Sequence, residues 1–321
     1  MMSCLKKTLL FFFPLLLIFV LLNAWLDRES SPHYALQYRE VFHPKVNANI
    51  IILGASAATH GVNPKYLENN HLKVFNFSLN GAGPSLNLKW YQKIFQLHYP
   101  KPLGVIYGVH WGMFDGKMAH RQFEQDSQYF PPEFFYREFS HLKGYRDLET
   151  LKTLILNRIP LVRERKQLVK RLFGKTKDVF ILEKYYNGYI PYERRGGLNK
   201  RKDFRPRNQE AQIRDFEALL DEFKRDNIEV IFVQVPGYFP ARTASNIEEA
   251  MELIDRIARK RNIPFLDYDT RRVTDINTDP SMFSDWLHLN EKGSHAFSDR
   301  LKSDLEPFLG RIVANKEKPS T

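Results

Sequence analysis

Three residues with the chemistry of nucleophilic catalysis lie near opposite ends of the chain. Ser56 follows an apolar run, residues 50–53, in a turn of small residues, and Asp285 and His288 stand three positions apart near the carboxyl terminus. A serine hydroxyl is a weak nucleophile at neutral pH and needs a base that a third group orients. A spacing of three residues places a carboxylate and an imidazole on one side of a helical turn. The sequence therefore predicts Ser56 as nucleophile, His288 as base and Asp285 as the orienting carboxylate of one site.

An alternation of strands and helices is predicted around these residues. Apolar runs predict strands over residues 50–53, 74–77, 103–107, 228–235 and 263–266. Amphipathic segments predict helices over residues 84–97 and 247–261, and two further helices that Asn208 and Asn290 cap and that run through Phe223 and Leu305. This alternation is typical of a parallel sheet with helices on both faces, whose ligands bind at the carboxyl ends of the strands. Ser56 stands at the carboxyl end of the first strand.

The pattern divides the chain into successive segments. Residues 1–28 are predicted as a cytoplasmic stub with a transmembrane signal anchor, 29–48 as a linker, 49–114 together with 208–310 as the catalytic domain, 115–207 as a basic, aromatic-rich insertion, and 311–321 as a disordered tail. Hydrophobic residues make up 43% of the chain and charged residues 26%, which is ordinary for a globular protein with its own core. We therefore expect one α/β domain that carries a large, mainly helical insertion.

The amino-terminal segment has the composition of a membrane anchor. Two lysines precede an uncharged apolar run over residues 8–26. About 19 residues at 1.5 Å each come close to a hydrocarbon core of roughly 30 Å, so this run is long enough to span it. The lysines orient the run with Met1 in the cytoplasm, which places the main domain outside, in the periplasm or on the cell-wall side. A cleaved signal peptide is the alternative, although Leu22 stands where a cut after Ala24 requires a small residue.

Four short motifs follow the strands in an order that resembles a known superfamily. Gly54-Ala55-Ser56 follows the first strand, Asn80-Gly81 the second and a turn the third, and Asp285 and His288 precede the last helix. This order resembles the motif blocks of the SGNH/GDSL hydrolase superfamily over about residues 49–309, apart from the insertion. The resemblance implies a flavodoxin-like three-layer sandwich and acyl-ester hydrolysis or transfer without a cofactor. Cys4 precedes the apolar run, so the exported part has no thiolate metal site, and no metal is expected.

The single anchor, the long insertion and the phrase Gly108-Val109-His110-Trp111 resemble one branch of this superfamily. That membrane-anchored branch includes the D-alanyl transfer proteins of teichoic acid synthesis and the alginate O-acetylation proteins. By this resemblance a membrane-bound acyl-donor protein is a candidate partner.

The resemblance also assigns the residues that would stabilise an oxyanion or line the pocket. The donors would be the backbone N–H groups of the nucleophile and of Gly81, beside Asn80. The third block of the superfamily usually offers an asparagine side chain, but His110 and Trp111 stand there instead. We expect His110, as a neutral imidazole, either to supply the third donor or to contact the acceptor. His60, four residues after the nucleophile, is expected to line the pocket or to cap its helix.

The insertion is strongly basic. Between residues 117 and 207, 22 Lys and Arg stand against 11 Asp and Glu, whereas the whole chain has 48 against 37, so the net positive charge resides in the insertion. A helix predicted over residues 160–173 has an apolar and a basic side. This is typical of a surface for anionic lipid headgroups or an anionic polymer, and equally of a packed helix with a solvated face. Tyrosines between residues 185 and 192 are candidates for stacking on sugar rings or for covering the core.

Two classes of function follow from these patterns. The first is a membrane-anchored, extracytoplasmic serine esterase or O-acyltransferase that acts on acyl esters of a cell-envelope glycan or anionic polymer. The sequence leaves open whether water or a sugar hydroxyl accepts the acyl group. The second class is a non-catalytic glycan-binding or assembly protein that keeps the fold, and the presence of Ser56, Asp285 and His288 disfavours it. Export excludes nucleic acid as a partner.

Overall fold

The structure, a computed structural model, describes residues 2–29, 32–42, 47–115, 152, 156, 159–163, 184–193, 198, 207–239, 245–269 and 275–316. It divides into two compact units, residues 1–36 with 124–177 and residues 37–123 with 178–321. The larger unit contains the sheet and the candidate site, and the smaller unit contains the amino-terminal helix.

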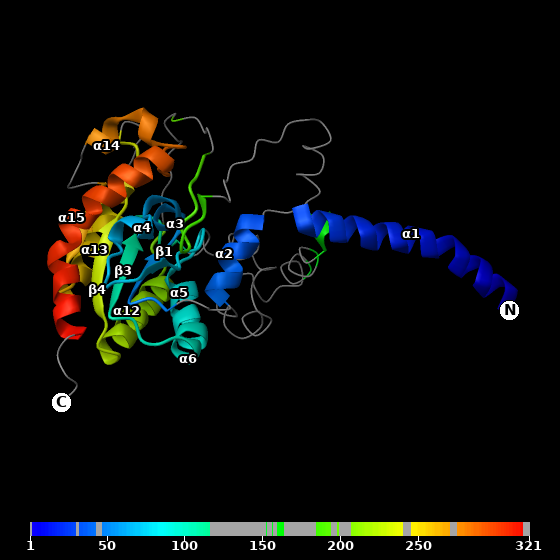
Figure 1. Ribbon diagram of the computed structural model, residues 1–321, viewed down its shortest axis with the longest axis horizontal. Coiled ribbons are helices and arrows are strands. Elements are labelled where there is room, and N and C mark those ends of the chain that lie inside the picture. The colour runs from blue at the N-terminus through cyan, green and yellow to red at the C-terminus, as the bar shows by residue number, and fades with distance from the viewer. Residues whose placement is uncertain are drawn as a thin grey trace. The chain divides into compact units, whose positions relative to one another are not determined.

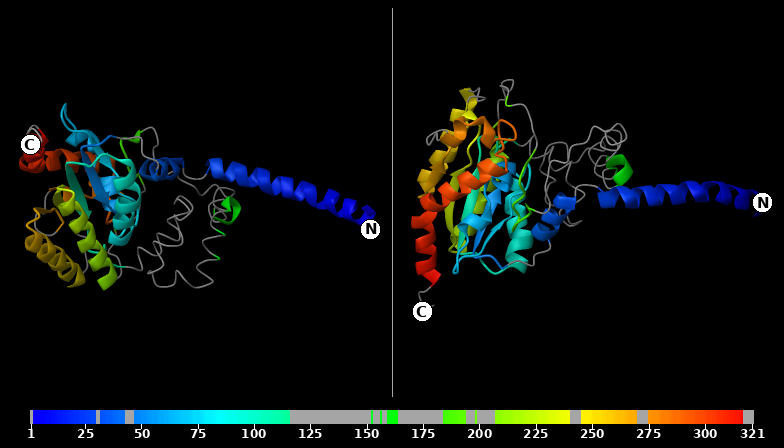
Figure 2. Two further views of the ribbon diagram at one scale, coloured as in Figure 1. Left: turned by 90° about the horizontal axis from the view of Figure 1, so that it is seen from below. Right: turned by 45° about the horizontal axis from the view of Figure 1, so that its top comes forward.

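The larger unit is built on a parallel sheet with the strand order β2-β1-β3-β4-β5 (Figures 1 and 2). Its five strands are β1 Ile50–Gly54, β2 Val74–Asn76, β3 Gly104–Val109, β4 Glu229–Gln234 and β5 Phe265–Asp267. Ile52 of β1 lies opposite Asn76 on one side and Ile106 on the other. This strand order is the flavodoxin-like one, with the first strand at the point where the order reverses. The prediction of an α/β fold with about five parallel strands is confirmed.

Helices cover both faces of this sheet (Figure 2). On one face, Phe297 and Leu301 of α15 (Glu291–Lys316) share a buried core with Ile106 of β3. On the other face, the ring of Phe216 in α12 (Glu210–Arg225) lies 5.1 Å from the ring of Tyr107. Ile106 and Tyr107 are neighbours on β3, so they point to opposite faces. The strands read as continuous apolar runs because both faces are covered.

Further helices lie between the strands and after the last strand. They are α3 Ser56–Gly61, α4 Pro64–Leu67, α5 Pro84–Trp90, α6 Gln96–His98, α13 Ser245–Arg261 and α14 Asp275–Thr278, with a π-helical turn η1 Tyr91–Phe95 and a 3-10 turn η5 Pro280–Met282. Asn290 caps α15 as predicted, because its Oδ1 accepts a hydrogen bond of 2.9 Å from Gly293 N. The predicted cap at Asn208 is wrong by one residue, since Gln209 precedes the first turn of α12.

Two segments expected to lack structure are helical. The predicted linker 29–48 contains α2, Pro32–Phe42, whose Tyr38 and Val41 are buried. Trp90 Nε1 donates to Val41 O over 2.9 Å, so the last turn of α2 is tied to the larger unit. The predicted tail 311–321 is helical as far as Lys316, because Ile312 is buried against Gly104 of β3.

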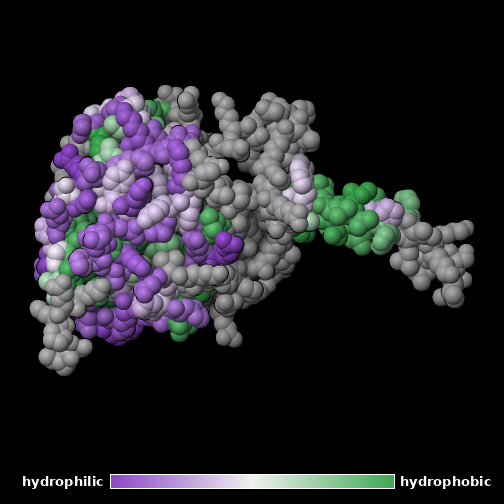
Figure 3. Space-filling view, in the orientation of Figure 1, coloured by the Kyte–Doolittle hydropathy of each residue, from purple (hydrophilic) through white to green (hydrophobic). Residues whose placement is uncertain are grey.

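The smaller unit contains α1, Met2–Glu29, and α10, Pro160–Arg163. Asn23 Oδ1 accepts a hydrogen bond of 2.8 Å from Leu161 N, which joins the two helices. Large apolar side chains from Phe11 to Leu21 are exposed on α1 (Figure 3). Within the part of the chain that the structure describes, no helix meets the length and hydropathy needed to cross a membrane. Most of the helix predicted over 160–173, beyond Arg163, lies outside the described residues.

Candidate active site

Ser56 begins α3 at the carboxyl end of β1. The chain turns at Gly54, which has a φ of +147°, a conformation that L side chains rarely adopt. A Cβ on Gly54 would also lie 2.7 Å from Gly108 O of the neighbouring strand. Glycine is therefore required here for Ser56 to leave the sheet at this angle.

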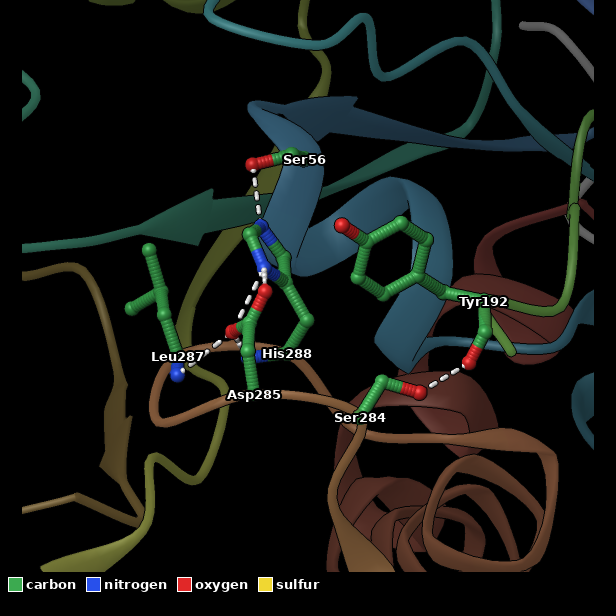
Figure 4. A network of polar contacts seen from close by, with 6 residues as sticks. All are labelled: Ser56, Tyr192, Ser284, Asp285, Leu287 and His288. Carbon is green, nitrogen blue, oxygen red and sulfur yellow. Dashed lines mark hydrogen bonds and ion pairs between the residues drawn. The ribbon is translucent and has the colours of Figure 1, made fainter. Parts of the chain in front are cut away.

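Ser56, His288 and Asp285 form one chain of hydrogen bonds (Figure 4). His288 Nε2 lies 2.8 Å from Ser56 Oγ, and His288 Nδ1 lies 2.9 Å from both carboxylate oxygens of Asp285. The structure thus brings together residues 232 positions apart in the sequence, as the sequence reasoning expected. This arrangement lets the imidazole take a proton from the hydroxyl while the carboxylate fixes its tautomer.

The carboxylate of Asp285 is held in its charged form. Burial raises its pKa, but the hydrogen bond from His288 and the backbone N–H groups of Leu287 and His288 outweigh burial, so the pKa lies below its ordinary value. Both N–H groups donate to Oδ1 over 2.9 Å. These bonds fix the carboxylate against the loop and orient it toward His288.

A small pocket opens at Ser56. Ser56, Gly81 and His110 line it together with Ala82, Met113 and Asp115, and its volume is about 40 Å³. Gly81 has a φ of +66°, so it turns the backbone tightly after β2. Space for a few heavy atoms beside the hydroxyl suits a small acyl group.

His110 borders this pocket in a defined tautomer. Its Nδ1 accepts a hydrogen bond of 3.0 Å from Gly112 N, so the proton of the neutral ring is on Nε2. Burial, with a smaller contribution from the charge of His288, lowers its pKa to about 4. At neutral pH the ring is therefore an uncharged Nε2–H donor.

His60 has the opposite tautomer. Its Nδ1 lies 2.8 Å from Ile190 O, and because a carbonyl only accepts, Nδ1 carries the proton. Burial lowers its pKa to about 3, with a further contribution from His288, and the side chain of Asn80 is also hydrogen-bonded to it. His60 packs edge-on against His288, with 5.8 Å between the ring centroids. It is not among the residues that line the pocket at Ser56, and its bond to Ile190 supports the segment that contains that residue.

The segment 184–193 contributes residues that sequence reasoning did not assign to the site. The ring of Tyr192 lies 5.1 Å from that of His288 and is stacked on His60 at 5.0 Å. Ser284 Oγ donates to Tyr192 O, as Figure 4 shows. The sequence indicated these tyrosines only as candidates for stacking on sugar rings or for covering the core, not as neighbours of His288. The segment turns at Gly188, where a side chain would collide with Asn76 O. Tyr189 is buried, so it covers the core, whereas Tyr192 covers His288.

Trp111 lies beyond His110 rather than beside Ser56. Its ring packs against Trp286 with 5.8 Å between the centroids. It lines a neighbouring pocket at the carboxyl end of β4. Among the residues that the structure describes, no group of three His, Cys, Asp or Glu is arranged to hold a metal ion.

The chain is similar to one protein family and to several solved structures. Residues 157–303 match the DltD protein family, a range that includes Asp285 and His288 and begins after Ser56. No curated protein matches the chain. A GDSL-like lipase from Bacteroides thetaiotaomicron VPI-5482 is 12% identical, with a TM-score of 0.41 over 86% of this chain and 100% of its own. A lipase/acylhydrolase from Enterococcus faecalis is 12% identical, with a TM-score of 0.41 over 81% and 96%.

The family match covers residues 157–207 of the predicted insertion as well as the loop that bears the aspartate and the histidine. It agrees with the resemblance that the motifs predicted, in which a serine after the first strand is completed by Asp-x-x-His before the last helix. Over residues 157–303 the chain therefore resembles the DltD protein family.

Proposed function

We propose that this protein is a serine esterase or O-acyltransferase that acts on acyl esters of a cell-envelope glycan or anionic polymer. The observation that carries the proposal is the hydrogen-bonded chain from Ser56 through His288 to Asp285. The resemblance to the DltD proteins supports a substrate in the cell envelope.

The first half of the reaction forms an acyl-enzyme. Ser56 Oγ attacks the ester carbonyl as His288 Nε2 takes its proton, and the same imidazolium then protonates the leaving alcohol. Asp285 stays charged and stabilises the imidazolium. The second half repeats these steps in reverse, with water or an acceptor alcohol in place of the departed group. The products are a free acid in the first case and a new ester in the second.

We propose three donors for the tetrahedral oxyanion. Two are the backbone N–H groups of Ser56 and Gly81, which border the same pocket. We propose that the third is His110 Nε2–H, which takes the place of the asparagine side chain. Because the pKa of His110 is about 4, its ring does not ionise at neutral pH and keeps this donor without competing for the proton of Ser56.

Membrane attachment through α1 is part of this proposal. The exposed apolar side chains from Phe11 to Leu21 support it, because such a surface is unfavourable in water. A chain attached in this way, with the catalytic unit outside the cytoplasm, would meet envelope polymers and a membrane-bound acyl donor. A fusion of a reporter to Thr321 should be active outside the cytoplasm, and the chain should stay in the membrane fraction after a carbonate wash. A shortened protein in the soluble fraction would contradict attachment.

A serine-reactive fluorophosphonate tests the catalytic proposal against the non-catalytic alternative. The probe should label the wild-type chain, and Ser56→Ala should abolish labelling. Ser281→Ala, which changes an exposed hydroxyl outside the pocket, should label like the wild type. Equal labelling of all three chains, or none of the wild type, would contradict a reactive Ser56.

A further inference from the structure

A second pocket lies next to the first, at the carboxyl end of β4. The two pockets share Ala57, His110 and Leu287 as common walls. The second has a volume of about 20 Å³, which is enough for one water-sized group such as a hydroxyl. A molecule that inserts one group here therefore contacts residues that also border the pocket at Ser56.

Gln234, the last residue of β4, lines this second pocket. The residue is buried, with 2% of its surface exposed, and its Oε1 has no hydrogen-bond partner among the described residues. A buried amide oxygen without a partner is destabilising, because it has lost water and gained nothing in return. The hydroxyl of a bound molecule would supply the missing donor.

The walls around Gln234 are held in place by backbone hydrogen bonds. Tyr238 N donates to Trp286 O over 3.0 Å, and Gly237 N donates to Asp269 Oδ1 over 3.2 Å. Trp286 packs on Trp111, with ring planes inclined by 31°, and both line the pocket. Aromatic rings beside a polar group are suited to a ligand with both an apolar face and hydroxyl groups.

We infer that this second pocket is the subsite for the acyl acceptor, and that the acceptor is a sugar or polyol. One of its hydroxyl groups donates to Gln234 Oε1 while another reacts. In the reacting step His288 Nε2 takes the proton of that hydroxyl, and its oxygen attacks the acyl carbonyl on Ser56. The ester bond to Ser56 breaks as His288 returns the proton to Ser56 Oγ, so the acyl group ends on the acceptor. This inference rests on the proposed function and adds the class and place of the acceptor.

The test measures how the acyl-enzyme partitions between two alcohols of equal size. The full chain is given 4-nitrophenyl acetate with either ethylene glycol, which has a second hydroxyl, or 1-propanol, which has a methyl group there. Acetyl ester and free acetate are both quantified. Gln234→Met keeps the size of the side chain but removes the amide. It should lower the preference for ethylene glycol over 1-propanol by roughly 3- to 10-fold, the effect of one neutral hydrogen bond.

Gln37→Met is the matched control. Gln37 is also fully buried with an unpartnered Oε1 among the described residues, but it lies against Ser78, outside both pockets. Its variant should keep the wild-type preference. An unchanged preference in Gln234→Met, or an equal fall in Gln37→Met, would overturn the subsite. Where Gln234→Met does not fold, Gln234→Asn, which shortens the amide by one methylene, replaces it with the same expectation.

A binding measurement separates failure of the subsite from failure of the proposed function. Methyl β-D-glucopyranoside should change the tryptophan fluorescence of the wild-type chain, and Gln234→Met should weaken this response by roughly 3- to 10-fold in apparent affinity. Trp286→Leu should abolish it. A response without ester turnover would retain the subsite and reject the enzyme. The absence of a response in the wild type would overturn the subsite even if the ester is hydrolysed.

Discussion

His60 and His110 are both buried, both neutral at pH 7 and both close to His288, yet they are arranged in opposite ways. His60 donates from Nδ1 to Ile190 O and so leaves Nε2 without a proton. His110 accepts at Nδ1 from Gly112 N and so presents Nε2–H. The backbone atom that meets Nδ1 therefore decides which ring can stabilise an anion. Of these two rings, only that of His110 has an N–H at Nε2, the ring nitrogen farther from the backbone.

Removal of the nucleophile or base should have the largest effect. Ser56→Ala and His288→Ala should each lower kcat for ester cleavage by on the order of 10⁴-fold or more, because members of a triad act as a unit. Ser56 is half-buried at a turn, so the variant should keep the urea midpoint of the wild type. Steady-state kinetics with a chromogenic ester measure the loss. Near-wild-type activity in either variant would remove the site assignment.

Substitution of His110 should have the next largest effect. His110→Ala should lower the acylation rate by roughly 10- to 1000-fold, the range for loss of one oxyanion donor. His110→Gln should restore part of this rate, because the amide nitrogen of glutamine can reach the position of Nε2. His110→Asn places its amide nitrogen where Nδ1 was and should restore less. Rates of acylation from stopped-flow bursts compare the three variants, and equal rates in all of them would reject the donor role.

The two histidines should also make the fold sensitive to acid. Each has a folded pKa well below the ordinary 6.5, so the unfolded chain binds more protons than the folded chain as the pH falls below about 6.5. Stability should therefore be lost from about pH 6.5 downward, to about pH 4 for His110 and about pH 3 for His60. Each contributes a slope of about 1.4 kcal/mol per pH unit within its window.

Urea unfolding at several pH values measures this slope. His110→Gln and His60→Asn should each make the dependence on pH shallower, since each removes one buried imidazole. A slope that neither variant alters would show that other groups cause the acid sensitivity.

Substitution of His60 should have the smallest effect on the chemistry. His60→Asn keeps a donor near the position of Nδ1 for Ile190 O, so kcat should fall by less than about 10-fold, since only a packed neighbour of His288 is changed. His60→Ala leaves that buried carbonyl without its donor and should destabilise the fold by about 1–3 kcal/mol. A fall in kcat for His60→Asn as large as that for His110→Ala would remove the distinction between the two rings.

The sequence predicted the parts of the site that depend on local pattern. The apolar run of β1 ends in Gly54, which predicts the turn that carries Ser56, and the spacing of Asp285 and His288 predicts their contact. Contacts between distant backbone atoms could not be predicted in this way. The tautomer of His60 depends on Ile190, which is 130 residues further along the chain.

The helical part of the linker was predictable in principle. Tyr38, Val41 and Phe42 are spaced as one face of a helix, and all three are buried. The length of α15 was not, because the burial of Ile312 depends on a glycine in β3. The role of Gln234 could not be predicted either. In the sequence, a glutamine at the end of a strand looks the same whether it contacts a ligand or is hydrogen-bonded within the core.

Trapping of the acyl-enzyme is the most direct test of whether Ser56 is the nucleophile. The full chain is quenched in acid within the burst of 4-nitrophenyl acetate turnover, digested, and examined by mass spectrometry. One acetyl group is expected on the peptide that contains Ser56. Turnover with no acyl group on Ser56, or with a stoichiometric acyl group on another residue, would contradict this expectation.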